Sequence, residues 1–253
     1  MQNIPVRTEL GREIRKAFVA SPGRILVGAD YSQIELRLLA HISGDEGLIA
    51  AFNSGEDIHT STAAEVFGVD KAIVTREQRS AAKAVNFGIV YGISDYGLAK
   101  NIGVSRKEAG EFIRRYLEKY CGVQEYMHRC VEEGRKKGYV TTLMGRRREL
   151  PEIKSSNFNT RSFGERVAMN MPIQGTAADI IKMAMVNVHK RLEEEGLKAR
   201  LILQIHDELI IDTPFDEEQR VRKLLAECMQ NVMKLKVPLI ADVSSGHSWF
   251  DTK

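Results

Sequence analysis

Cysteine is scarce in this sequence, and no run of apolar residues is long enough to cross a membrane. The 253 residues include three cysteines, Cys121, Cys130 and Cys228, an odd number without metal-ligand spacing. We interpret them as small core residues in a reducing compartment, not as a disulfide framework. No apolar run approaches the ~20 residues that span a bilayer, and residues 1–10 lack the apolar stretch of a signal peptide. A cytoplasmic protein is therefore expected.

An excess of charge of one sign is also lacking, because the formal net charge is only +3. A protein that binds nucleic acid need not be basic overall, but it should cluster its basic residues. Such clusters occur at Arg76/Arg79/Lys83, Arg106/Lys107, Arg114/Arg115, Arg135/Lys136/Lys137 and Arg146/Arg147/Arg148. Most charge runs are solvated helix faces, so only clusters beside a chemical motif count toward function.

The chain has no internal repeat, low-complexity tract or flexible linker. Its hydrophobic pattern predicts both strands and helices. Helices are predicted over 33–42, 45–54, 58–67, 76–91, 123–137, 160–195 with a kink at Pro172, and 216–235, and another begins at Ser105 with Glu108 as its capping-box partner. Strands are predicted over 24–30, 201–205, 208–212 and 239–243, and a hairpin joins 139–143 to 147–150. Strands early and late with helices between them indicate the α+β class, with a mainly helical subdomain inserted into a sheet layer.

Two acidic residues end apolar strands that are far apart in the chain. Asp30 follows R-I-L-V-G-A, and Asp207 lies in the turn between L-I-L-Q-I and E-L-I-I. If these strands are neighbours, the two carboxylates repel each other unless a cation lies between them, and a divalent ion with oxygen ligands is the usual one. Two such ions about 4 Å apart would serve phosphoryl transfer. The spacing alone leaves open a plainer interpretation, in which Asp30 is a helix N-cap and Asp207 a turn residue.

The stretch R-S-A-A-K-A-V-N-F-G-I-V-Y-G predicts a helix with a basic and aromatic face. Arg79, Lys83, Phe87 and Tyr91 recur every four residues, so they share one gently drifting face. Like charges at i and i+4 destabilise an isolated helix, and a triphosphate would offset that repulsion. Phe87 would then meet the sugar and base. The sequence alone equally allows a solvated basic face beside core aromatics.

In this order, these segments resemble the motifs of family A DNA polymerases of the bacterial DNA polymerase I type. D-Y-S-Q-I-E-L-R (30–37) resembles motif A, R-x3-K-x3-F-x3-Y-G (79–92) resembles motif B on the fingers O helix, and Q-I-H-D-E (204–208) resembles motif C. Further matches are residues 2–7, 145–151 and 170–179. The resemblance implies an antiparallel palm sheet with packed helices and an inserted, mainly helical fingers subdomain. It places the palm at 1–44 and 156–253 and the fingers at 45–155.

The resemblance also implies an activity: a template-directed DNA polymerase core that transfers deoxynucleotides from dNTPs to a primer 3′-hydroxyl by a two-metal mechanism and releases pyrophosphate. Asp30 and Asp207 would ligate two Mg²⁺ ions, which Mn²⁺ could replace, and the Tyr31 backbone carbonyl would complete a site. Glu208 would be an accessory acid near the primer end. Lys83 would bind the triphosphate and donate a proton to the leaving pyrophosphate.

The remaining roles that the resemblance implies concern the nucleotide and the DNA. The nucleotide would be bound by Gln33, Glu35, His59, Arg79, Lys83, Phe87 and Tyr91, with Glu35 excluding a 2′-hydroxyl and Tyr91 stacking at the template position. The primer–template would be contacted by Arg7, Arg146, Arg147, Arg148, Arg166, Asn170, Gln174 and His206. His59 could instead be an ordinary cap or core residue, and Asn170 an ordinary polar helix position.

Polymerases of this type carry a thumb and an exonuclease-like domain before the position where this chain begins, so a truncated fragment or a minimal polymerase is expected. The expected partners are primer–template DNA and dNTPs, without a membrane. The protein is expected to be monomeric and to act in a bacterial cytoplasm at the nucleoid. Two alternatives stay open: a thumbless fragment that binds DNA or dNTP with little or no turnover, and an RNA polymerase or other relative with the same palm.

Overall fold

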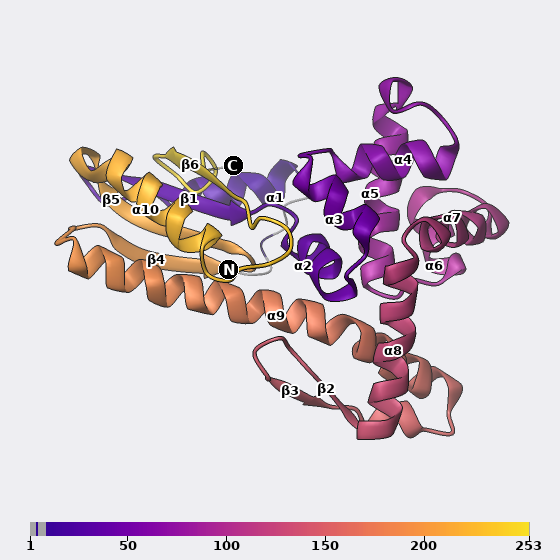
Figure 1. Ribbon diagram of the computed structural model, residues 1–253. Coiled ribbons are helices and arrows are strands. Elements are labelled where there is room, and N and C mark those ends of the chain that lie inside the picture. Colours follow the sequence, from indigo (N-terminus) through magenta and orange to yellow (C-terminus); the bar gives the residue numbers. More distant parts are fainter. Residues whose placement is uncertain (1–3, 5–8, 253) are drawn as a thin grey trace. The chain divides into compact units, whose positions relative to one another are not determined.

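The computed structural model describes residue 4 and residues 9–252, which form two compact units (Figure 1). Unit 1 comprises the described residues within Met1–Ile34, Ala177–Lys234 and Leu239–Lys253, and unit 2 comprises Glu35–Thr176 and Leu235–Pro238. Unit 1 contains a sheet and unit 2 is mainly helical, so the predicted α+β class is confirmed. The assignment of palm and fingers to 1–44, 45–155 and 156–253 stays a prediction.

The sheet of unit 1 has four antiparallel strands in the order β4-β5-β1-β6. They are β1 (Arg24–Tyr31), β4 (Arg200–Ile205), β5 (Glu208–Pro214) and β6 (Ala241–Gly246). The apolar run of β1 is buried, as expected for a central strand that is covered on both faces. The early strand and the late hairpin are therefore neighbours, the condition on which the sequence argument for Asp30 and Asp207 depended, because β1 pairs with β5.

The two faces of this sheet are covered by different segments of unit 1. Helix α10 (Glu218–Gln230) packs against β1 and β6, and the Tyr31 hydroxyl donates to the Met229 carbonyl oxygen at 2.7 Å. The short elements α1 (Glu9–Glu13) and the 3-10 turn Ile14–Ala17 precede the strand. A cluster of Leu26, Ile205, Ile210 and Trp249 forms a core in this unit.

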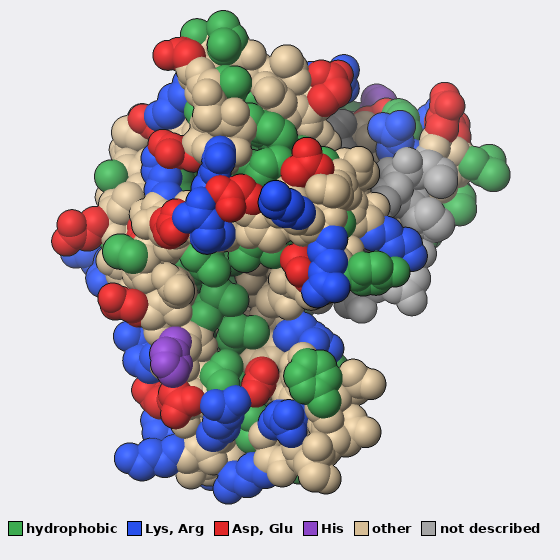
Figure 2. Space-filling view, turned by 90° about the vertical axis from the view of Figure 1, so that its right-hand side faces the viewer, with side chains coloured by type: hydrophobic (Ala, Val, Ile, Leu, Met, Phe, Trp, Pro, Cys, Tyr) green, Lys and Arg blue, Asp and Glu red, His purple; other side chains and the backbone are tan. Residues whose placement is uncertain are grey.

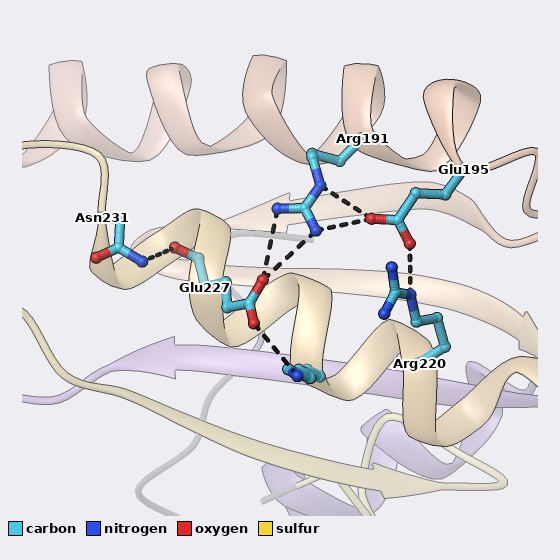
Figure 3. A network of polar contacts seen from close by, with 6 residues as sticks. Arg191, Glu195, Arg220, Glu227 and Asn231 are labelled. Carbon is cyan, nitrogen blue, oxygen red and sulfur yellow. Dashed lines mark hydrogen bonds and ion pairs between the residues drawn. The ribbon is translucent and has the colours of Figure 1, made fainter.

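A network of charged side chains joins α10 to the end of α9 (Phe158–Glu194) (Figure 3). Arg191 lies between Glu195 at 2.7 Å and Glu227 at 3.4 Å, and Arg220 contacts the other oxygen of Glu195 at 2.5 Å. Shared partners reduce the side-chain entropy that an isolated surface pair loses, although each exposed pair contributes only about 0–1 kcal/mol.

The helix predicted over 216–235 ends five residues early, at Gln230. The following segment turns into unit 2, where its backbone is held by side chains of other elements. Arg37 donates to the Pro238 carbonyl at 2.8 Å, Asn53 donates to the Lys236 carbonyl at 3.2 Å, and the Lys236 N–H donates to His41 Nδ1 at 3.1 Å. These tertiary hydrogen bonds replace helical ones, so the helix predicted for residues 231–235 was wrong.

The helices of unit 2 follow the predicted pattern with one addition. They are α2 (Ile34–Ser43, which begins in unit 1), α3 (Glu46–Asn53), α4 (Ile58–Phe67), α5 (Arg76–Val90), α6 (Asp95–Ile102), α7 (Arg106–Lys119) and α8 (Cys121–Lys137). The predicted capping box of Ser105 and Glu108 is confirmed, and Thr75 with Gln78 forms a second one at the start of α5. Helix α6 was not predicted, because Leu98 is its only buried residue and the segment therefore lacks a helical apolar pattern.

The hairpin β2 (Tyr139–Thr141) and β3 (Arg147–Glu149) is confirmed, and it packs with a short turn and α9 into a second core of Val140, Leu150, Ile153 and Ala168. Gly164 of α9 lies against the backbone of the 3-10 turn Pro151–Lys154, and a Cβ there would be 2.7 Å from the Ile153 nitrogen. Close packing therefore requires glycine at this position.

Helix α9 runs without interruption through Pro172, with its first half in unit 2 and its second half in unit 1. The Thr176 hydroxyl donates to the carbonyl of Pro172, four residues earlier, at 2.5 Å, a side-chain bond that Thr makes within helices. None of the described helices is both long and apolar enough to cross a bilayer.

Candidate active site

The acidic centre in unit 1 lies where the end of β1 meets the beginning of its antiparallel neighbour β5. Asp30 is the register partner of Glu208, and the Tyr31 N–H donates to the Asp207 carbonyl oxygen at 3.2 Å. Directly opposed residues of an antiparallel pair project from the same face with Cβ atoms about 5 Å apart. Asp30 and Glu208, two acids from segments remote in sequence, are thus brought to one corner of the sheet. The convergence of the Asp30 and Asp207 side chains stays a prediction.

The backbone around these acids is strained at two places. Gln33 has a φ of 55° and His206 a φ of 53°, and among the described residues no other non-glycine residue has a positive φ. Each lies within three positions of a predicted catalytic aspartate. A left-handed conformation costs an ordinary L-residue roughly 1–2 kcal/mol, and such strain clusters at functional sites. The His206 carbonyl accepts from Gln204 Nε2 at 2.6 Å, which helps to fix the turn.

Glu208 is buried at 2% exposure beside these groups, and its carboxylate has an aromatic donor. The indole Nε1–H of Trp249 points at both carboxylate oxygens, with distances of 3.2 Å to Oε1 and 3.3 Å to Oε2. Trp249 was not predicted as part of the site, because no spacing relates it to motif C. Trp249 is the only tryptophan of the sequence, and this was the one feature that could have drawn attention to it.

The donor set of this corner suits a hard divalent cation. The groups predicted to bind metal, the carboxylates of Asp30 and Asp207 and the backbone carbonyl of Tyr31, would offer oxygen ligands only, which Mg²⁺ prefers. No three His, Cys, Asp or Glu side chains gather closely enough within residue 4 and residues 9–252 to form a metal site by themselves. A site of this kind therefore needs oxygens from the backbone, the substrate or water in addition to the two aspartates.

In unit 2, helix α5 carries the predicted basic and aromatic face. Arg79 and Lys83 are exposed, Phe87 is half-buried, and Tyr91 at the C-cap is 41% exposed. The buried side chains, among them Ala82, Val85 and Ile89, occupy the other side of the helix. The predicted amphipathic arrangement is therefore confirmed, whereas the binding of a triphosphate to it stays a prediction.

Arg79 contacts an acid that sequence reasoning missed. Its Nε donates to Asp57 Oδ2 at 2.5 Å, and Asp57 also caps α4 by accepting from the His59 N–H at 3.0 Å. Burial alone would raise the pKa of Asp57, but hydrogen bonds from Arg79, Thr60 and the His59 backbone together lower it to about 2. The position of Asp57 before I-H-T at a helix start indicates a helix cap, but nothing in the sequence relates Asp57 to Arg79.

His59 is buried at 2% exposure and lies in a polar chain inside unit 2. Thr62 donates to Asn86 Oδ1 at 3.0 Å, so the Asn86 amide nitrogen faces His59 Nδ1 at 2.9 Å and donates to it. The remaining ring proton is therefore on Nε2. Burial lowers the pKa of His59 to about 4, so the ring is neutral at pH 7 and would contact a phosphate as a neutral donor.

Glu35, the residue predicted to exclude a 2′-hydroxyl, lies in unit 2 and accepts from the Tyr91 hydroxyl at 2.8 Å. Burial raises the pKa of Glu35, and the Tyr91 hydrogen bond opposes that rise. Two residues from motifs A and B, separated by 56 positions, are thus in direct contact.

The residues predicted to contact DNA are distributed over both units. Asn170 donates to the Tyr91 carbonyl at 3.3 Å, and Arg166 donates to Ser162 at 3.0 Å. Gly92, with a φ of 65°, lets the chain after α5 approach Met169 and Arg166 closely. Gln174 is half-buried on the same helix as Asn170. Arg7 lies outside the described residues.

Most basic clusters seen in the sequence are neutralised by acids on the same surface. Arg106 pairs with Asp95 at 2.7 Å, and Arg114 pairs with Glu111 and Glu118, each at 2.5 Å. Figure 2 shows Lys and Arg side chains interspersed with Asp and Glu on the face in view. Arg146, Arg147 and Arg148 on the β2–β3 hairpin are exposed, and Arg147 contacts Glu149 at 2.6 Å.

Known proteins resemble this chain over its whole length. The sequence profile of DNA polymerase family A matches residues 1–251. DNA polymerase I of Bacillus subtilis (strain 168) is 60% identical over 254 residues, and that of Caldicellulosiruptor bescii is 56% identical over 253 residues. Each comparison covers 100% of this chain but only 29% and 30% of the relative.

A solved structure agrees with these matches. The POL domain of Pol1 from M. smegmatis, in complex with DNA primer-template and dNTP, is 47% identical and has a TM-score of 0.95. That comparison covers 100% of this chain and 45% of the solved one. The chain thus spans less than a third of the curated relatives and less than half of the solved chain. Because the family profile covers nearly all of its residues, this chain belongs to DNA polymerase family A.

Proposed function

We propose that this chain forms the palm and fingers of a DNA polymerase that transfers deoxynucleotides from dNTPs to a primer 3′-hydroxyl. The observation that carries the proposal is the pairing of β1 with β5, which sets Asp30 opposite Glu208 and Tyr31 beside Asp207. The M. smegmatis POL domain was solved with DNA primer-template and dNTP, which supports the same substrates for this chain. The chemistry is nucleotidyl transfer with release of pyrophosphate.

The acidic corner would hold two Mg²⁺ ions, with Asp30 and Asp207 as carboxylate ligands and the Tyr31 carbonyl as a further oxygen. When bound, such ions lower the pKa of the attacking hydroxyl and neutralise charge on the transferred phosphate. The oxygen-only donor set described above supports Mg²⁺, and Mn²⁺ could replace it.

The helix face of α5 would bind the incoming nucleotide. Arg79 and Lys83 would hold the triphosphate, and Lys83 would donate a proton to the leaving pyrophosphate. Arg79 would exchange its contact with Asp57 for phosphate oxygens, and a guanidinium suits both groups because each offers a pair of oxygen acceptors. His59 would add a neutral Nε2–H donor, and Phe87, whose ring centroid is 6.0 Å from that of His59, would pack on the sugar.

Sugar selection would belong to Glu35, whose place is fixed by the Tyr91 hydroxyl. A glutamate under the sugar leaves no room for a 2′-hydroxyl, so dNTPs would be used in preference to rNTPs. Arg166, Asn170, Gln174 and His206 would contact the minor groove near the primer end. Acceptors there occupy similar places in all correct base pairs, which suits recognition of shape without sequence.

The test is extension of a labelled primer with Mg²⁺ and either dNTPs or rNTPs. We expect extension with dNTPs and little with rNTPs, and the Glu35→Ala variant should reduce that difference. Asp216→Ala, which changes an exposed acid outside these motifs, is the matched control. Equal use of both nucleotides would favour an RNA polymerase, and binding of DNA without extension would favour a non-catalytic module.

A further inference from the structure

We propose that Trp249 is a positioning residue for Glu208, and that the C-terminal segment of the chain thereby fixes the acidic corner of the site. The inference rests on the proposed polymerase function for its kinetic consequence, but not for the contact itself. All residues that carry it lie in unit 1.

The contact is suited to holding a carboxylate in one orientation. The single N–H of the Trp249 indole lies 3.2 Å and 3.3 Å from the two oxygens of Glu208, so it is shared almost equally between them. Trp249 is 0% and Glu208 2% exposed. A buried carboxylate is costly without hydrogen-bond donors, and rotation of the Glu208 group would weaken its bond to the indole.

The indole itself is held from several sides and cannot follow the carboxylate if it turns. The Arg15 guanidinium lies 4.1 Å from the centre of the indole ring, and the Phe18 ring packs on it edge-on at 5.5 Å. The Trp249 backbone N–H donates to the Phe18 carbonyl at 2.9 Å, and Thr252 donates to the Trp249 carbonyl at 2.9 Å. Trp249 is therefore a rigid support, and the guanidinium stacked on its ring adds a cation–π contact to its placement.

Glu208 requires such a support because of its neighbours. Asp30 is its register partner on β1, and Asp207 precedes it in the chain. Like charges directly opposite each other on a sheet are destabilising, so the pairing with Asp30 favours rotation of the Glu208 carboxylate away from it, and the indole donor opposes that rotation. The indole donor favours one orientation of Glu208, which leaves Asp30 and Asp207 for the proposed metal binding.

The kinetic consequence is a loss of turnover without a loss of nucleotide binding. Removing the donor should lower kcat about tenfold, which corresponds to about 1.4 kcal/mol. KM for the dNTP should stay the same, because the residues proposed to hold the triphosphate are on α5. A change that only loosened the fold would instead alter both kcat and KM, or lower the free energy of unfolding.

Because the sequence contains one tryptophan, the test can act on this side chain alone. Residue-specific replacement of tryptophan by benzothienylalanine substitutes sulfur for the N–H and keeps the shape of the ring system. Trp249→Phe serves as a second donor-free variant. The contact itself is read from the single indole resonance of ¹⁵N-tryptophan-labelled protein, before and after Glu208→Leu, with Glu208→Ala, which also lacks an acceptor, in its place if the leucine variant does not fold.

We expect the indole resonance to move upfield when Glu208 is replaced, and kcat to fall in both donor-free variants at unchanged KM. In the Glu208→Leu background, removing the donor should cost no further activity, because its acceptor is already absent. A further loss of similar size in that background would make Trp249 a packing residue only and overturn the proposal.

Two other results are decisive. An indole resonance that stays in place on replacement of Glu208 overturns the contact, and a donor-free variant with full kcat overturns its role. If the unmodified chain extends no primer, the proposed function and the kinetic role of Trp249 both fail, whereas the resonance still decides whether the contact exists.

Discussion

The imidazole of His59 is the residue whose protonation state depends most clearly on its surroundings. Burial lowers its pKa from 6.5 to about 4, and Asn86 occupies its Nδ1. Because the folded pKa lies below the unfolded one, the stabilisation by the neutral ring is complete above about pH 6.5. It is lost progressively as the pH falls toward 4.

This predicts a specific pH dependence of stability. Between pH 7 and 4.5 the unmodified chain should lose about 2 kcal/mol more free energy of unfolding than His59→Gln, which does not titrate. Urea unfolding of both proteins at the two pH values measures the difference. An equal loss in the two proteins would mean that His59 titrates normally in the folded chain.

Phe87 carries a prediction about the sugar of the incoming nucleotide. It lacks the hydroxyl that a tyrosine could offer in place of a missing 3′-hydroxyl, so dideoxynucleotides should be used poorly. Phe87→Tyr should raise the use of ddTTP relative to dTTP by about tenfold or more, as expected for one charge-assisted hydrogen bond. Competitive incorporation of the two nucleotides measures this, and near-equal use by the unmodified chain would refute it.

The contacts of single residues were the part that the sequence could not predict. Asp57 with Arg79 and Glu208 with Trp249 are separated by 22 and 41 positions. Neither pair follows a helical or strand period, so only the folded chain brings them together. The recurrence of Arg79, Lys83 and Phe87 was predictable because it follows the helix period itself.

At the scale of elements, the backbone of α9 approaches the turn Pro151–Lys154 at Gly164. A Cβ there would lie 2.9 Å or less from two backbone atoms of Ile153, which cannot move aside as a side chain can. Gly110 in α7 is the matched case without such a neighbour, since the nearest atom to its Cβ would be 3.9 Å away.

We therefore expect opposite effects from the same substitution in these two helices. Gly164→Ala should lower the free energy of unfolding by about 2 kcal/mol through overpacking, whereas Gly110→Ala should raise it by about 0.5–1 kcal/mol through helix propensity. Thermal or urea unfolding tests both. A stabilised Gly164→Ala variant would show that the close approach is not required.

The elements were predictable where local chemistry and tertiary packing agree. The strands β1, β4 and β5 follow from apolar patterning, and the start of helix α7 follows from the capping box of Ser105 with Glu108. The end of α10 was not predictable, because Arg37 and Asn53 bind the carbonyls of the next segment. Helix α6 was missed because it buries Leu98 alone and so has little apolar periodicity.

At the scale of the whole molecule, the formal net charge of only +3 predicts that few Lys and Arg side chains are available to contact DNA. Arg148 on the exposed β2–β3 hairpin is one that could contact phosphate, whereas Arg114 is held by Glu111 and Glu118. Arg148→Ala should reduce the slope of log K for duplex DNA against log salt by about 0.9, one phosphate contact. Arg114→Ala should leave the slope unchanged, and an equal effect of both would contradict this assignment.

The central claim is that Asp30 and Asp207, remote in sequence, act together in nucleotidyl transfer. Its most direct test is single-turnover incorporation of one dNTP with Mg²⁺, at protein concentrations that saturate a hairpin primer–template. We predict that Asp30→Ala and Asp207→Ala each abolish incorporation while Asp216→Ala does not, with all three variants folded by circular dichroism. Incorporation at an undiminished rate by either folded aspartate variant would contradict the account.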